Sequence, residues 1–105
     1  MLAPVESLSV PHDHARLVRV LDRSLALADR AIELRPDEAD AHVQRGDTLL
    51  AMGRVDEAIA ELKEGIRLQP DRATAHGSLA RAYWLGTGRI DEAIREFEET
   101  LRLNP

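Results

Sequence analysis

GRVDEAI occupies residues 53–59 and GRIDEAI occupies residues 88–94, so this chain of 105 residues carries one phrase twice, 35 residues apart. Each copy begins with Gly, which suits a turn, and continues with Asp-Glu, whose carboxylates stabilise the positive end of a helix. Each copy is therefore typical of a turn followed by a helix start. The repetition predicts that the chain contains two copies of one structural unit.

The similarity extends beyond the phrase in both directions. Residues 54–70 and 89–105 share ten of 17 positions. Upstream, LRPDEADAH ends at His42 and LQPDRATAH ends at His76, which are 34 residues apart rather than 35. The difference arises because AMG in the first copy faces LGTG (85–88) in the second. We therefore expect one added residue in the internal turn of the second unit.

Apolar residues at helical spacing follow each Asp-Glu pair and predict one apolar face per helix. Pro70 and Pro105 stop these helices, and the Gly within each unit separates them from an earlier helix of about 14 residues. Each unit is therefore a pair of helices. The apolar face consists of Ala58, Ile59, Leu62 and Ile66 in the first unit and Ala93, Ile94, Phe97 and Leu101 in the second.

On these residues the unit resembles the tetratricopeptide repeat (TPR), a 34-residue helix-turn-helix with small residues where its helices touch. Residues 39–72 and 73–105 carry the pattern, and the matching residues are Gly46, Leu49, Ala58, Leu62, Gly65 and Pro70, then Leu79, Ala80, Tyr83, Ala93, Phe97 and Pro105. The resemblance implies an all-α fold of helical hairpins in a right-handed superhelical stack. Four residues depart from the pattern and are expected to weaken packing: His42, His76, Arg45 and Thr100.

Residues 21–36 fit the second helix of a further unit whose first helix is missing. That first helix would contain Pro11, which removes a backbone donor and clashes with the preceding turn. We expect one long helix from about Asp13 to Arg35 instead, a half-repeat-like cap over residues 13–36 after a flexible segment 1–12. The chain then has about five helices.

Both ends of the predicted stack carry apolar surface. The apolar arc of the first helix spans about 200°, roughly twice what a one-sided surface helix needs. The last helix has a face that would receive a following helix, because repeats bury their faces only against neighbours. One hypothesis is therefore a structural or assembly domain, a homo-oligomer that self-associates through these two faces, or a part of a longer array.

Composition excludes several classes of function. The chain has no cysteine, so it has no disulfide, thiolate metal site or cysteine nucleophile. The net charge is -5 and no segment is strongly basic, which disfavours nucleic acid as a partner. No stretch approaches the roughly 18 apolar residues that span a bilayer, so we expect no membrane partner and a cytoplasmic location. No catalytic or cofactor-binding signature occurs, and we expect neither enzyme activity nor a cofactor.

Two short motifs have simpler interpretations than the functions they resemble. RGD at 45–47 matches an adhesion tripeptide, but it falls inside a predicted helix rather than at a loop tip. His42 and His76 are about one repeat apart, too far to share a metal ion, so packing is the preferred interpretation. HDH at 12–14 could bind a metal weakly, although helix capping or disorder explains it better. We expect no metal site.

The resemblance implies that the first helix of each unit lines a concave groove. The expected groove residues are Gln44, Asp47, Leu50, Ser78, Arg81 and Trp84. An exposed indole beside Arg81 is typical of a binding anchor, so Trp84 is the leading contact. The alternative is that Trp84 covers the lengthened turn at 86–88. The leading hypothesis is a non-catalytic interaction module or scaffold that binds a protein or peptide partner, as a peptide or helix, in this groove.

Overall fold

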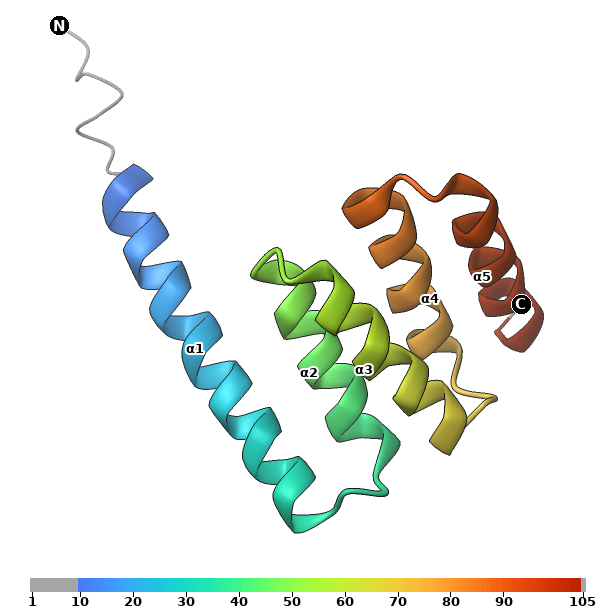
Figure 1. Cartoon of the computed structure of the whole chain (residues 1–105), viewed down its shortest axis with the longest axis horizontal. Coiled ribbons are helices and arrows are strands. Elements are labelled where there is room, and N and C mark those ends of the chain that lie inside the picture. The colour runs from blue at the N-terminus through green and yellow to red at the C-terminus, as the bar shows by residue number, and fades with distance from the viewer. Residues whose placement is uncertain (1–9, 105) are drawn as a thin grey trace, which may run out of the picture.

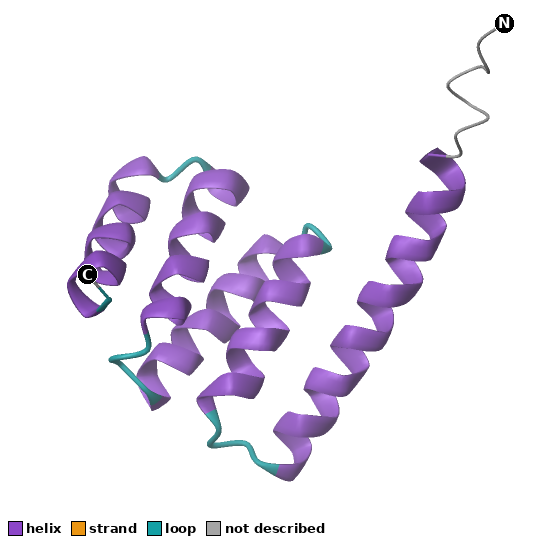
Figure 2. Ribbon diagram, turned by 180° about the vertical axis from the view of Figure 1, so that it is seen from behind, coloured by secondary structure: helices purple, strands orange, loops and turns teal. Residues whose placement is uncertain are grey.

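The computed structural model describes residues 10–104, which form a curved stack of helices (Figure 1). This range contains α1 (Val10–Leu34), α2 (Ala39–Ala51), α3 (Val55–Leu68), α4 (Ala73–Arg81) and α5 (Ile90–Leu103), and α4 continues directly into a π-helical segment, η2 (Ala82–Thr87). No strand occurs between residues 10 and 104 (Figure 2), so the all-α prediction is confirmed. No helix in the described range is long and apolar enough to cross a membrane.

The long N-terminal helix begins at Val10 rather than near Asp13. Pro11 lies in its first turn, where a backbone N–H has no helical partner, so proline is tolerated there. Asp13 also lies in this turn, where its carboxylate favours the positive helix end. Residues 10–12, expected within a flexible segment, thus belong to α1, whereas residues 1–9 lie outside the described residues.

Each unit is an antiparallel hairpin in which small residues bring two backbones together. A Cβ placed on Gly46 of α2 would lie 2.7 Å from Cγ of Leu62 in α3, and one on Gly65 would lie 2.9 Å from Cγ2 of Val43. Both distances are shorter than a carbon contact allows, so only glycine lets α2 and α3 approach this closely. The glycines that matched the repeat pattern therefore set the spacing of the hairpin.

The two hairpin turns close in the same way despite their different lengths. Gly53 and Gly88 both adopt the left-handed conformation, with φ of 79° and 70°. The Arg54 N–H donates to the Leu49 carbonyl at 2.9 Å, and the Arg89 N–H donates to the carbonyl of Tyr83 at 2.9 Å. The second bond reaches one residue further back. The added residue therefore widens the end of the α4–η2 helix into a π-helical turn instead of lengthening a loop.

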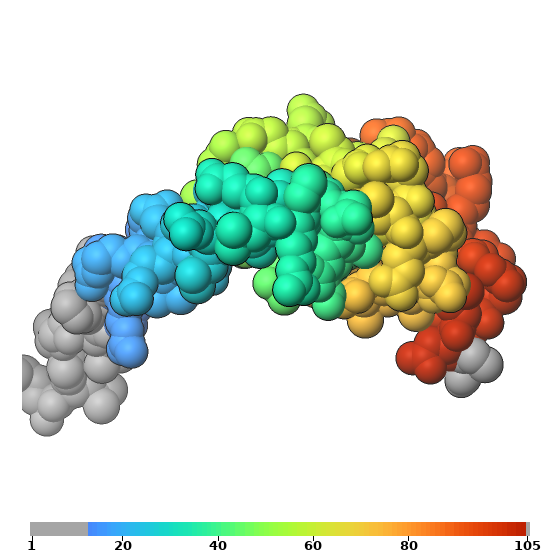
Figure 3. All heavy atoms as spheres, turned by 90° about the horizontal axis from the view of Figure 1, so that it is seen from below, coloured from blue at the N-terminus to red at the C-terminus, as the bar shows by residue number. Residues whose placement is uncertain are grey.

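The core lies between the two hairpins, where α4 packs on α3. Its buried residues are Val43, Ile59, Leu62, Ala75, Leu79, Ala82, Tyr83 and Ala93. The stack is curved: Figure 3 shows that the blue α1 end and the red α5 end both bend toward one side of the green middle. Such a curved stack presents a concave surface between its ends.

Candidate partner-binding surfaces

Three of the predicted groove residues meet in one groove between α2 and the α4–η2 helix. Asp47, Leu50 and Arg81 line it together with Val55 and Leu85, and its volume is 560 Å³. Nη2 of Arg81 lies 3.5 Å from Oδ1 of Asp47, so an ion pair crosses the groove beside apolar side chains. We call this the α2–α4 groove. It combines apolar area with a polar pair that can exchange partners, which suits a peptide ligand.

Gln44 lies in a neighbouring hollow of 300 Å³ between α1 and α2. The hollow is also lined by Ser24, Leu27 and Thr48, and it shares Asp47 with the α2–α4 groove. Gln44 is exposed. The exposed surface therefore continues from the groove across α2 to α1, and Gln44 lies at its edge.

Ser78 does not face the groove as the sequence predicted. It is buried, and its Oγ accepts a hydrogen bond from Nη2 of Arg81 at 3.1 Å. Because the two residues are three apart on α4, this bond orients the guanidinium toward Asp47. Ser78 is therefore a positioning residue for Arg81 and has little surface for a ligand.

Trp84 lies outside the α2–α4 groove, which corrects the predicted placement. Its indole packs edge-to-face on Phe97 of α5, with ring centroids 6.5 Å apart, and it remains 53% exposed. Trp84 is the third residue of η2, where the added residue changes the helical register that the repeat pattern assumes. The alternative, that it covers the turn at 86–88, does not describe its contact either.

Trp84 instead belongs to an open apolar face on α5. Trp84, Ile90, Ala93, Ile94 and Phe97 line a hollow of 240 Å³ on this face. The equivalent residues of α3 are covered by α4: Ile59 is 7% exposed and Leu62 0%, whereas Ile94 is 49% exposed and Phe97 37%. We call it the α5 face. Exposed apolar surface of this kind is typical of protein contact sites.

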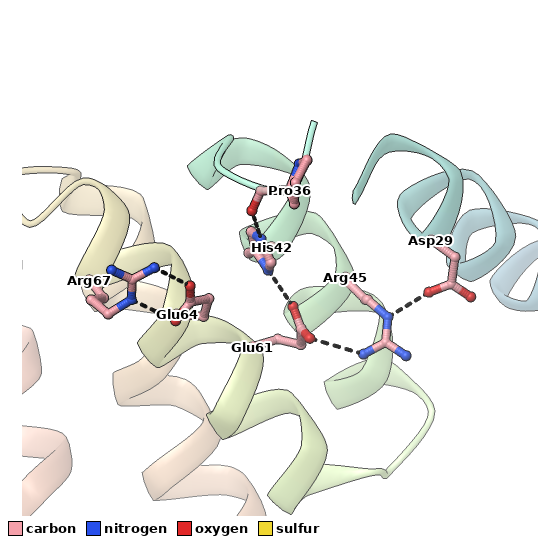
Figure 4. A network of polar contacts seen from close by, with 7 residues as sticks. All are labelled: Asp29, Pro36, His42, Arg45, Glu61, Glu64 and Arg67. Carbon is pink, nitrogen blue, oxygen red and sulfur yellow. Dashed lines mark hydrogen bonds and ion pairs between the residues drawn. The ribbon is translucent and has the colours of Figure 1, made fainter. Parts of the chain in front are cut away.

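Two of the residues that departed from the repeat pattern, His42 and Arg45, belong to a partly buried polar network (Figure 4). Nδ1 of His42 lies 2.8 Å from Oε2 of Glu61, and its Nε2 lies 2.7 Å from the Pro36 carbonyl. Arg45 donates to Glu61 at 3.2 Å and to Asp29 of α1 at 2.6 Å. The network thus joins α1, α2, α3 and the α1–α2 loop, so His42 and Arg45 make specific polar contacts at positions where the repeat pattern expects apolar side chains.

His76 repeats the arrangement in the second unit. Its Nδ1 lies 2.7 Å from Oε1 of Glu96, and its Nε2 lies 2.8 Å from the Pro70 carbonyl. Carboxylate and carbonyl oxygens only accept, so a ring that bonds both at once donates from both nitrogens, which favours its protonated form. Burial lowers the pKa of each ring, but the hydrogen bonds to the carboxylate and the carbonyl outweigh it, and the pKa of both His42 and His76 is raised.

The sequence held a signal for this network that repeat matching did not use. Each His lies six residues after a Pro and 19 or 20 residues before a Glu, in both units. Among residues 13–104, whose side chains are described, no group of three or more His, Asp or Glu could hold a metal ion, and His12 of the HDH motif lies outside this range. The RGD at 45–47 lies within α2, where Gly46 is buried against α3. Its Arg45 is held by Asp29 and Glu61, so the first two residues of the tripeptide serve packing between helices.

Comparisons with known proteins identify the repeat. A family model described as tetratricopeptide repeat matches residues 19–64 and 43–105. The TPR repeat-containing thioredoxin TTL4 of Arabidopsis thaliana is 43% identical over 60 residues, which are 57% of this chain and 9% of TTL4. Anaphase-promoting complex subunit 7 of Homo sapiens is 36% identical over 70 residues, which are 67% of this chain and 12% of that protein.

A solved structure resembles most of the stack. The crystal structure of MamA matches with a TM-score of 0.73 at 30% identity, over 83% of this chain and 50% of the MamA chain. This chain therefore spans about a tenth of the length of the two curated relatives and half of the length of the MamA chain. The likeness concerns the helical stack.

Proposed function

This chain belongs to the tetratricopeptide repeat family, and from that premise we propose that it is a non-catalytic interaction module that binds a peptide or helix of a partner protein in the α2–α4 groove. The observation that carries the proposal is the groove itself, where Leu50, Val55 and Leu85 adjoin the Asp47–Arg81 pair. Repeats of this family are typically interaction modules. The acidic balance of the chain, with a net charge of -5, disfavours nucleic acid or an anionic membrane as that partner.

The groove residues have different roles in this proposal. Leu50 and its apolar neighbours contact apolar side chains of the ligand, and Arg81 and Asp47 exchange their mutual pairing for polar groups of the ligand. Ser78 holds Arg81 in place. Gln44 extends the contact toward α1. Because Leu50 is at the centre and Gln44 at the edge, substitutions at Leu50 should have the larger effect on affinity.

A random peptide display library tests the groove. Peptides selected on the wild-type chain should bind the variant Leu50→Asp at least about tenfold more weakly, because a carboxylate is then placed among apolar contacts. Titration calorimetry with the selected peptides gives the dissociation constants. The matched control is Ile94→Asp, which places the same carboxylate on the α5 face and should leave peptide affinity unchanged.

Two results contradict the groove. One is a set of peptides that bind Leu50→Asp as tightly as the wild-type chain. The other is a set that loses affinity for Ile94→Asp alone, which assigns recognition to the α5 face and its Trp84. Circular dichroism of both variants establishes that each retains its helices before affinities are compared.

The second candidate function is assembly through the ends of the stack, and the α5 face favours it. Ile90, Ile94, Phe97 and Leu101 are each between 37% and 66% exposed, although their counterparts in α3 lie against α4. Trp84 extends this apolar surface. Covering it with a second copy of the chain would remove it from water, which is favourable in proportion to the apolar area buried.

A further inference from the structure

A second, exposed apolar stripe lies on α1, and one of its residues, Leu27, also lines the hollow that contains Gln44. It consists of Val20, Leu27 and Leu34, all exposed, at intervals of seven residues. An arginine precedes each by four residues: Arg16, Arg23 and Arg30, also exposed. Residues four apart are neighbours on a helix surface, so a row of guanidinium groups borders the stripe along one side.

The α5 face has the opposite border. Asp91 and Glu98 are exposed and flank the apolar row formed by Ile94, Phe97 and Leu101. At 1.5 Å per residue, the two carboxylates are about 10.5 Å apart along the axis, and Arg23 and Arg30 have the same separation on α1. The two carboxylates and the two arginines therefore match in sign and spacing, with Arg95 of α5 lying between the carboxylates along the helix.

The acidic border of α5 differs from its counterpart in α3 at one of its two positions, since Asp56 of α3 matches Asp91. Lys63 of α3 stands at the position that Glu98 holds in α5, 35 residues later. The change from a cation to a carboxylate occurs on the helix whose apolar face is open. A carboxylate there favours a basic partner surface and disfavours an acidic one.

The borders also determine a direction. The position of a side chain around a helix axis can be given as an angle that increases by about 100° per residue. On α5 the carboxylates lie at larger angles than the apolar row, whereas on α1 the arginines lie at smaller angles than the apolar stripe. When two helices face each other and run parallel, the larger-angle side of one lies next to the smaller-angle side of the other, as in parallel coiled coils. A parallel arrangement therefore brings the carboxylates of α5 next to the arginines of α1. Within the chain, α1, α3 and α5 run in the same direction (Figure 1). Continuing the stack with a second copy therefore places its α1 parallel to α5 of the first.

We propose that the α5 face of one copy binds the α1 stripe of a second copy in parallel, with Asp91 facing Arg23 and Glu98 facing Arg30. This inference rests on the assembly function proposed above and adds the partner surface and the register. The apolar residues in contact are Ile94, Phe97 and Leu101 on one side and Leu27 and Leu34 on the other. The contact joins two different faces, so further copies extend it into a ring or a filament.

Sedimentation velocity of the chain over a range of concentrations measures this association. The double variants Arg23→Glu/Arg30→Glu and Asp91→Arg/Glu98→Arg should each dissociate at concentrations at least about tenfold higher than the wild-type chain, because like charges then face each other. An equimolar mixture of the two should associate as the wild type does, because every contact between different variants again pairs Arg with a carboxylate. Circular dichroism verifies that both variants are folded.

The matched control is Lys63→Glu, a charge reversal of the same kind on α3, which should leave association unchanged. A chain that sediments as a monomer at every concentration overturns both the inference and the assembly function, and leaves the α2–α4 groove unaffected. Association that survives both double variants, or that only the α5 variant weakens, overturns the α1–α5 register while assembly stands. A mixture of folded variants that fails to associate overturns the register as well.

Discussion

The outer faces of α3 and α5 carry nearly the same apolar pattern but have different surroundings. Leu62 in α3 is fully buried under α4, whereas its counterpart Phe97 in α5 is more than a third exposed. Local helix structure is the same in both, since α3 and α5 each span 14 residues. Burial in this repeat is therefore decided by the next helix in the stack, so equivalent residues contribute differently to stability and to binding.

The largest expected effect comes from truncating the buried member of that pair. Leu62→Ala should lower the free energy of unfolding by about 3 to 5 kcal/mol, because it leaves a cavity between two hairpins. Phe97→Ala should cost about 1 to 2 kcal/mol, because part of its ring already contacts water. Urea denaturation followed by circular dichroism gives both values. Equal losses would show that the two faces are equally covered in solution.

In contrast to Leu62 and Phe97, the two histidines should contribute about equally to the free energy of unfolding, because both units contain the same histidine contacts. His42→Ala and His76→Ala should each cost about 1 to 3 kcal/mol, because each removes the donor to a partly buried carboxylate oxygen and to a backbone carbonyl. The pKa of each ring is raised above its ordinary value near 6.5, so its contribution is complete below that pH and is lost as pH rises through the raised pKa.

Denaturation at pH 6 and pH 8.5 measures this contribution. The wild-type chain should be more stable at the lower pH, and each His variant should show a smaller difference between the two. Glu61→Gln and Glu96→Gln are the matched controls, since they remove the carboxylate and keep a hydrogen-bond acceptor. A loss at His42 with none at His76 would mean that the second unit is held together differently from the first.

The smallest effect on stability is expected at Trp84. Trp84→Ala removes one edge-to-face contact with Phe97 from a side chain that is half exposed, so it should cost at most about 1 kcal/mol. Leu50→Ala, at the equivalent position of the first unit, should cost more, because Leu50 packs against the core. Thermal unfolding by circular dichroism compares the two. A larger loss at Trp84 would show that the α5 face supports the fold.

Most of the fold could be predicted because repeat patterns encode helix contacts. Ala58 and Ala93, identified by spacing alone, are both buried where two helices meet. Gly46 and Gly65 hold the close approach that the repeat requires. Such features depend on the size and spacing of side chains, which the sequence displays directly.

Side-chain direction and polar partners could not be predicted in the same way. A repeat pattern assumes α-helical register, and the π-helical turn at η2 breaks it where Trp84 lies. The pattern also treats His42 as a poor substitute for an aromatic ring, because spacing does not reveal which acceptors surround a buried donor. Of the six predicted groove residues, the α2–α4 groove contains Asp47, Leu50 and Arg81, with Gln44 in the adjoining hollow.

The π-helical turn also bears on how arrays of this kind change over evolution. His76 and Glu96 are 20 residues apart and their counterparts are 19 apart, yet the contacts measure 2.7 Å and 2.8 Å. The inserted residue is absorbed before Gly88, whose left-handed conformation redirects the chain into α5 as Gly53 does into α3. A gene encoding such repeats can gain or lose a codon in this turn while every later helix keeps its phase, so sequence length drifts without disturbing the architecture.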